Sequence, residues 1–532
     1  RRRDFSASVN ELEALREEPS SASGSEELDE RPDDRFREVT DRVEEDREAL
    51  ASTIRTRALE YGTEPTKVAR PIPIKPAIQD QQTRSRGPIS RPELMREIDA
   101  KQAPFSTFSL HVGEASFLLA AAALERGEIP DPAMVRTEEF YNAFDYGDPV
   151  PRDDEPVACA LEQSAHPAVP QRNMMRVAIR TGGSGRMPAT PLNLTLLLDH
   201  SGSMERDDRE EGVRKAITQL SSLLGPGDTI TVVGFARTPH LLADRLDGAD
   251  AGTLDRLVES IPSQGGTNLE TALALGLDLA RRQFVEGAQN RVVLFTDGAA
   301  NLGDAEPERL NETILKMREL GIAFDAAGFG ADGLNDELLE RLTRQGNGRY
   351  YVVDRPEDSG TGFAAKLAGA FRPAAEDVKV QVVFNPSRVG RYKLFGFEKH
   401  RLKQEDFRND LVDAAELAAE ETGVALYQFE PLPEGEGDVG EVRVRFREVA
   451  SGQMVERTWT IPYDPQVPAF ADAKESLQLA TVAAFTAERL RRSSLAGVVE
   501  WSELTPVMER VQDHFRRQPS LRQLRAMVEA LR

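Results

Sequence analysis

Residues 192–204, LNLTLLLDHSGSM, join a continuous apolar run to one carboxylate and two hydroxyls. The apolar run has the character of a strand that is buried on both faces. Asp199, Ser201 and Ser203 then alternate at a spacing of two. Taken alone, these three residues have two interpretations. They are ordinary capping groups at the start of a helix, or they are three oxygen ligands gathered on one loop.

The sequence around this stretch alternates between strand and helix patterns, from residue 191 to about 371. Apolar runs with strand character cover 192–199, 228–236, 291–298, 321–330 and 349–354. Helical spacing of apolar residues covers 211–225, 267–284, 307–320, 335–346 and 362–371. Alternating strands and helices predict an α/β fold with a doubly wound, mostly parallel sheet.

Three polar sequences fall at the carboxyl ends of the predicted strands or just before a helix. The first holds Asp199, Ser201 and Ser203, the second is QGGTN with Thr267, and the third is FTDG with Asp297. Ligands of open parallel sheets bind beyond the carboxyl ends of the strands. We therefore expect these five side chains, from three distant segments, to meet at one edge of the sheet.

Three hydroxyls and two carboxylates form a set of hard oxygen donors. Magnesium favours a few carboxylates together with hydroxyls and waters in an octahedron. Two carboxylates only just neutralise a divalent ion, so an open position on the metal attracts a further carboxylate from outside. No histidine or thiolate in the set favours zinc. This donor set predicts a site that binds an acidic ligand through Mg²⁺.

The trio DHSGS, GGTN and TDG resembles the von Willebrand factor type A domain and its metal-ion-dependent adhesion site. The family pattern matches at Asp199, Ser201, Ser203, Thr267 and Asp297. The resemblance implies a Rossmann-like fold and a Mg²⁺ (or Mn²⁺) site. It implies that the hydroxyls bind the ion directly and that the carboxylates act directly or through water. The residue after the first aspartate, His200, is expected to be an ordinary exposed histidine, with ligand contact at the rim of the site as the alternative.

The likeness extends into both flanks of this domain. Residues 140–151 and 376–402 resemble the flanking regions of the bacterial YfbK-like group, many of whose members are envelope lipoproteins. The resemblance implies a protein of the bacterial cell envelope, periplasm or surface, with a cytoplasmic location as the alternative. Any membrane association is expected only through a segment that the chain does not contain, since the sequence begins RRRDF without a methionine.

The composition divides the chain into five regions. We expect a disordered acidic tail and linker over 1–100, an α+β flanking region over 101–188, and the type A domain over 189–372. A β-rich region over 373–465 is expected to share a β-sandwich with the N-terminal flank, and a helical region covers 466–532. Integrin-like proteins insert a type A domain into a sandwich in the same way, and the helix near 361–371 would then link metal occupancy to the sandwich.

Composition also excludes several function classes. The net charge of −23 argues against nucleic-acid binding, which needs clustered Lys and Arg. The single cysteine, Cys159, excludes a disulfide framework and is expected to be a small buried apolar residue. The sequence GFGADG at 328–333, with Asp354 further on, fits a dinucleotide-binding pattern but follows a late strand rather than the first. We therefore expect no nucleotide.

These patterns predict a non-enzymatic, metal-dependent protein-binding module that recognises an Asp or Glu of a partner protein, in adhesion or complex assembly. The main alternative uses the same site in an intracellular assembly or regulatory factor that works with an AAA+ ATPase. A metal hydrolase is a third class, against which the sequence offers no evident general base beside the site.

Overall fold

The computed structural model describes residues 97–152, 155–183, 190–259, 265–298, 307–355, 361–371, 373–412, 414–449 and 451–532. The tail and most of the linker predicted over 1–100 lie outside these ranges. The end of that linker is instead part of the fold. β1 (Ile98–Asp99) pairs with another strand, and Glu97 accepts two hydrogen bonds from Arg172 at 2.8 and 2.9 Å.

The α/β domain is built on a six-stranded sheet with the order β10-β9-β8-β5-β6-β7. Its strands are β5 (Leu192–Asp199), β6 (Thr229–Phe235), β7 (Pro239–Asp247), β8 (Gln289–Thr296), β9 (Ile322–Phe329) and β10 (Tyr350–Val353). All neighbours pair in parallel except β7, which lies antiparallel at an edge. Every residue of β5 is buried, as the leucine-rich run requires. The predicted α/β fold class is confirmed.

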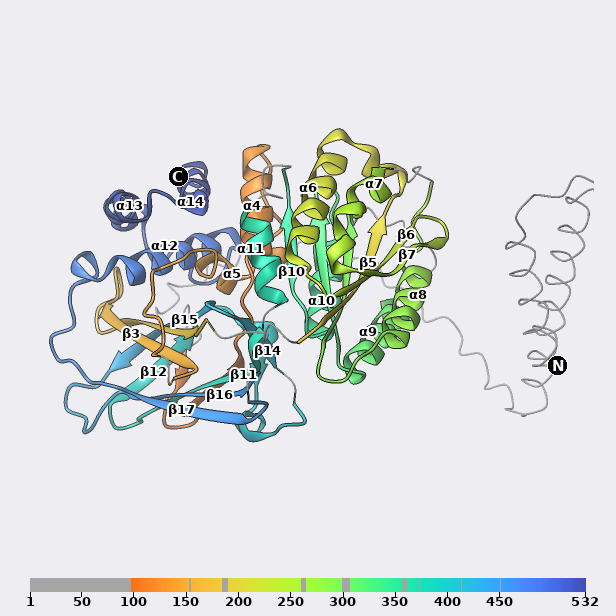
Figure 1. The fold of residues 1–532 in the computed structure, drawn as a ribbon. Helices are drawn as coiled ribbons and strands as arrows, with labels where there is room; N and C mark the ends of the chain where they lie inside the picture. The colour runs from red at the N-terminus through yellow and green to blue at the C-terminus, as the bar shows by residue number, and fades with distance from the viewer. Residues whose placement is uncertain are drawn as a thin grey trace, which may run out of the picture. The chain divides into compact units, whose positions relative to one another are not determined.

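Helices cover both faces of this sheet (Figure 1). They are α6 (Asp207–Leu223), α7 (Leu254–Glu259), α8 (Leu269–Arg282), α9 (Pro307–Glu319), α10 (Asp336–Gln345) and α11 (Thr361–Ala370). One apolar core joins α6 and α11 to the sheet, and a second joins α8, α9 and α10 to its other face. Two covered faces leave the ends of the strands as the open places for a site.

Strands from both flanks of the α/β domain form two further sheets. The first runs β1, β12 (Val389–Leu394), β15 (Thr422–Pro431), β4 (Asn173–Thr181) and β3 (Val157–Ala165). The second runs β13 (Arg401–Leu402), β2 (Phe105–Ser109), β11 (Pro373–Phe384), β16 (Gly440–Glu448) and β17 (Met454–Ile461), with β14 (Ala415–Ala418) beside β11. Both sheets contribute to one core, in which Phe384 stacks on Tyr392 at 4.2 Å. The α/β domain is thus inserted into a two-sheet body.

Five helices complete this two-sheet body. They are α4 (Ala115–Glu125), α5 (Thr137–Tyr141), α12 (Glu475–Leu490), α13 (Trp501–Phe515) and α14 (Pro519–Ala530). Helix α12 is buried along nearly its whole length and packs on α5, α13 and β4. None of the helices in the described part of the chain is long and apolar enough to span a bilayer.

Ion pairs join the two-sheet body to the α/β domain. Arg136 donates two hydrogen bonds to the carboxylate of Asp336, at 2.7 and 2.9 Å, and a third to Glu139. Arg349, just before β10, pairs with Glu421 of the β-rich part at 2.5 Å. These groups are largely buried, so removing one partner of a pair would leave an uncompensated buried charge and destabilise the protein.

Three elements differ from what their local sequence patterns alone indicate. Residues 131–144 form a short 3-10 turn and then α5, not one helix, because Val135 and Arg136 are extended. The edge strand β7 has no unbroken apolar run, because it carries four charged or polar residues and none of its residues is fully buried, and this hid its strand character. Helix α13 contains Pro506, which reads as a helix breaker.

Candidate functional site

The loop after β5 folds back on its own aspartate. The backbone N–H of Ser201 donates to Asp199 Oδ1 at 2.9 Å, and Thr296 Oγ1 donates to Asp199 Oδ2 at 2.7 Å. Burial raises the pKa of Asp199, the hydrogen bonds from Ser201 and Thr296 oppose this rise, and the like charge of Asp297 adds to it. Both oxygens of the carboxylate are therefore held in fixed directions at the end of the strand.

The end of β6 brings the second segment to the same place. The carbonyl of Phe235 accepts from the N–H of His200 at 3.0 Å, and the carbonyl of Ala236 accepts from the N–H of Asn268 at 2.7 Å. Two successive carbonyls therefore hold the serine loop and the Thr267 segment side by side. Asn268 also caps α8, since its side chain accepts from Thr271 N–H.

The third segment follows β8, which pairs with β5. Leu198 lies opposite Phe295, so the residues after them, Asp199 and Thr296, are neighbours, and Asp297 comes next. Asp297 is fully buried, and its carboxylate accepts a hydrogen bond from Arg209 of α6. These contacts gather the two aspartates with the serine loop at one edge of the sheet.

The gathered donors fit a small divalent cation. Ser201 Oγ and Ser203 Oγ lie 3.1 Å apart. Two adjacent ligands of an octahedral Mg²⁺ are separated by about 3.0 Å, because each lies roughly 2.1 Å from the ion. Gly202, Gly265 and Gly266 around these donors are exposed, so the site opens to the surface. The hydroxyl pair is therefore already spaced as two neighbouring ligands.

No group of three or more His, Cys, Asp or Glu residues suited to a metal occurs among the residues that the structure describes. The donors of the proposed metal site are hydroxyls and two aspartates, a set suited to Mg²⁺ or Mn²⁺ rather than to zinc.

His200 is not the exposed histidine that we expected. Its side chain is 8% exposed and packs edge-on against His240 of β7, with ring centroids 5.0 Å apart. The hydrogen bond from its N–H to Phe235 turns the side chain toward the edge strand. The reason for the error is β7, which the sequence analysis did not identify and which covers this side of the loop.

Arg209 and Thr296 are the site residues that the sequence analysis missed. Arg209 lies in the charged run 205–211, which reads as a solvated face, yet it is 5% exposed. Its guanidinium also donates to the carbonyls of Ser203 and Asp332, each at 2.9 Å. The sequence did carry one sign that Arg209 is buried. It lies four residues before the buried Val213, which places both residues on the same face of α6.

The glycine-rich turn after β9 has a structural explanation. Gly330 and Gly333 both have positive φ, at +77° and +79°, where glycine is favoured. The carboxylate of Asp354 accepts a hydrogen bond from the N–H of Ala331 at 2.9 Å. Asp354 therefore braces this turn. Cys159 is only partly buried, and burial raises the pKa of its thiol to about 12.

Comparison with known families agrees with this architecture. Residues 194–299 match the von Willebrand factor type A domain model, and residues 92–176 match a von Willebrand factor model. Residues 369–436 match the C-terminal model of the uncharacterized protein YfbK. The three matches follow the α/β domain and parts of its two flanks.

Individual relatives give the same picture. The uncharacterized protein YfbK of Escherichia coli (strain K12) is 31% identical over 337 residues, which is 62% of this chain and 58% of the relative. Inter-alpha-trypsin inhibitor heavy chain H3 of Mesocricetus auratus is 28% identical over 203 residues, 37% of this chain and 23% of the relative. The chain thus spans well under two thirds of these relatives' lengths.

Solved structures are more distant. A von Willebrand factor type A protein from Catenulispora acidiphila aligns with 72% of this chain and 91% of its own, at 15% identity and a TM-score of 0.45. The family matches and the relative in Escherichia coli agree with each other. The chain contains a von Willebrand factor type A domain, and it is similar to the uncharacterized protein YfbK over the domain and parts of its flanks.

Proposed function

We propose that this chain is a metal-dependent protein-binding module. Asp199, Ser201, Ser203, Thr267 and Asp297 would hold a Mg²⁺ or Mn²⁺ ion. The observation that carries the proposal is the convergence of three distant segments at one sheet edge, with two serine hydroxyls 3.1 Å apart. The family supports it, because type A domains are interaction modules that often bind a divalent metal at this place.

The ion, when bound, would supply a positive charge with an open position for an external carboxylate. The residues of this chain would orient the two carboxylates that bind the ion. Thr296 and the Ser201 N–H fix the Asp199 carboxylate, and Arg209 fixes Asp297. Two carboxylates and one guanidinium leave a single negative charge in the site, so a divalent ion would make it net positive. We propose that the ligand is therefore an Asp or Glu side chain of a partner protein.

No covalent chemistry is proposed for this site. The hydroxyls of Ser201 and Ser203 lie 3.1 Å apart, and the Asp199 carboxylate beside them is held by the N–H of Ser201 and the hydroxyl of Thr296. We propose a binding role and expect phosphatase and peptidase assays with Mg²⁺ and Mn²⁺ to be negative. Placement in the cell envelope stays a prediction from the resemblance, and fractionation of the source cell tests it.

The test is capture of partners from the source cell by the immobilised chain. The comparison is between buffers with Mg²⁺ and with EDTA, and between the natural chain and Asp199→Ala. We expect a partner retained only by the natural chain with Mg²⁺, and lost when one of its surface acidic residues is changed to the amide. A partner retained equally in EDTA and by Asp199→Ala would contradict the proposal. Capture of an AAA+ ATPase in the same pattern would favour the assembly-factor alternative.

A further inference from the structure

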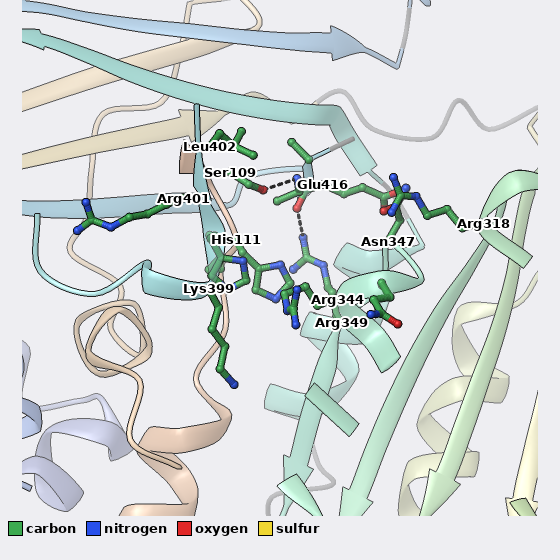
Figure 2. Close-up of a pocket in the computed structure, with 16 residues that line it drawn as sticks. Ser109, His111, Arg318, Arg344, Asn347, Arg349, Lys399, Arg401, Leu402 and Glu416 are labelled. Carbon is green, nitrogen blue, oxygen red and sulfur yellow. Dashed lines mark hydrogen bonds between the residues drawn. The ribbon is translucent and has the colours of Figure 1, made fainter. Parts of the chain in front are cut away.

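A cavity lies between the α/β domain and the two-sheet body, and none of the proposed metal ligands lines it (Figure 2). Its volume is about 200 Å³. It is lined from the two-sheet body by the segments 109–112, 399–402 and 414–416, and from the α/β domain by Arg318 and the segment 344–349. A molecule in this cavity would contact both parts of the protein at once.

Two stacked imidazoles stand in the cavity wall. His111 follows β2, and His400 ends a short 3-10 helix. Their ring centroids lie 4.8 Å apart with the planes 13° from parallel. Within the described ranges, no hydrogen-bond partner is found for either imidazole. Burial lowers the pKa of His111 to about 3 and that of His400 to about 4, so both rings are neutral at pH 7. Each ring then keeps one N–H to donate.

Five cationic side chains line the same cavity, namely Arg318, Arg344, Arg349, Lys399 and Arg401. Figure 2 shows Arg344 and Arg349 beside His111 at the centre, whereas Lys399 and Arg401 extend away from it. The outward pair therefore contributes mainly through the long-range field.

Carboxylates offset part of this charge. Glu340 pairs with Arg344 at 2.9 Å and with Lys399 at 3.0 Å, and Glu421 pairs with Arg349. Glu416 is the one acidic residue in the lining, and burial raises its pKa to about 7. The lining itself carries five cationic side chains and one carboxylate, in a chain whose net charge is −23.

We propose that this cavity binds a small anion through a phosphate group. Arg318 and Arg344 lie in the last turns of α9 and α10, and the imidazoles come from the two-sheet body, so donors approach from several directions. A tetrahedral phosphate accepts hydrogen bonds in several directions, whereas a carboxylate accepts them mainly in one plane. Each neutral imidazole adds one N–H donor, and this donor does not depend on the ring being protonated.

Such a ligand would strengthen the contact between the α/β domain and the two-sheet body. Arg349 already spans them, through Glu421 and through a hydrogen bond to the carbonyl of Glu416 at 3.1 Å. A ligand that binds only the native arrangement raises the stability of that arrangement by mass action. The proposal does not depend on the metal site, because that site is formed by residues 199–203, 267 and 297, none of which lines the cavity.

The test is calorimetric titration of the full chain with pyrophosphate in metal-depleted buffer, with inorganic phosphate and citrate as parallel titrants. We expect saturable binding of pyrophosphate, weaker binding of phosphate, and citrate weaker still. Arg344→Gln and His111→Gln should each weaken pyrophosphate binding by about tenfold or more, because each removes a hydrogen bond to a charged group.

Matched variants separate this site from unspecific attraction. Arg401→Gln changes a lining residue that extends away from the centre, and Asp199→Ala removes the proposed metal site. Both should bind pyrophosphate within about twofold of the natural chain, because neither group donates to the anion. Circular dichroism of every variant, without ligand, checks that it is folded.

Absence of saturable binding to the natural chain would overturn the proposal, as would equal losses in Arg344→Gln and Arg401→Gln. Citrate binding as tightly as pyrophosphate would overturn the assignment to phosphate. Loss of pyrophosphate binding in Asp199→Ala would place the anion at the metal site and contradict this inference. That outcome would leave the proposed metal function standing.

Discussion

The guanidinium of Arg209, on α6, donates a hydrogen bond to the carboxylate of Asp297, at the end of β8. Both side chains are almost fully buried. A permanent cation thus shares the pocket of a proposed metal ion. The guanidinium neutralises one of the two carboxylates and therefore opposes the binding of a metal cation. Once the metal ion is bound, the same positive charge would strengthen the attraction of the site for an external anion.

Arg209→Gln should bind Mg²⁺ about tenfold more tightly than the natural chain, because a nearby positive charge is removed at a partly buried site. Titration calorimetry with Mg²⁺ measures the change. Arg206→Gln is the matched control, since Arg206 is half-exposed and pairs with Asp208. Weaker Mg²⁺ binding by Arg209→Gln would instead show that Arg209 serves chiefly to hold Asp297 in place.

Thr296→Val should weaken Mg²⁺ binding by roughly ten- to a hundredfold, because the hydroxyl that orients Asp199 is lost. The carboxylate would then lose its 2.7 Å hydrogen bond without any change in the charge of the site. Thr296→Ser keeps the hydroxyl and should bind Mg²⁺ nearly as the natural chain does. Equal affinities of the valine and serine variants would contradict the orienting role.

Asp336→Asn should lower the free energy of unfolding by about 2–4 kcal/mol, because it breaks one side of a buried ion pair and leaves Arg136 with Glu139 alone. Urea unfolding followed by circular dichroism measures this loss. Asp208→Asn, at a more exposed pair, should cost less than about 1 kcal/mol. Similar losses in the two variants would show that the Arg136–Asp336 pair does not join the two parts.

Glu138→Gln should stabilise the protein at pH 8 and have little effect at pH 4.5. Burial raises the pKa of Glu138 from 4.5 to about 7, and Oε2 has no hydrogen-bond partner among the described residues. Between these two values the folded state holds more protons than the unfolded state, so stability falls as the pH rises through this window. The glutamine removes that loss, which we expect to be on the order of 1–3 kcal/mol.

Urea unfolding at both pH values tests this prediction. A gain that is the same at pH 4.5 and pH 8 would show that packing, rather than the charge of Glu138, is responsible. Glu128→Gln, at an exposed pair with Arg126, is the control and should change neither value appreciably.

The central sheet was predictable because its signal is local. The buried β5 has an unbroken apolar run, and each of its neighbours carries a similar run separated by helical spacing. The convergence of Asp199 and Asp297 followed from the rule for parallel sheets, and the pairing of β5 with β8 places them as that rule requires.

The remaining features depend on contacts between distant residues. Arg209 has the same sequence context as the exposed charges around it, and only the folded sheet edge gives it partners. His200 became buried because the edge strand β7 supplied His240 as a neighbour. Helix α13 forms around Pro506 because its apolar face, including Leu504 and Val511, packs into the core of the two-sheet body.

The central claim is that the edge formed by β5, β6 and β8 holds one divalent cation. Calorimetric titration of Mg²⁺ into the natural chain and into Asp199→Ala, with circular dichroism of both, tests it most directly. We expect one ion bound per natural chain and at least about a hundredfold weaker binding by a folded Asp199→Ala. Undiminished Mg²⁺ affinity in Asp199→Ala, or no Mg²⁺ binding by the natural chain, would contradict the assignment.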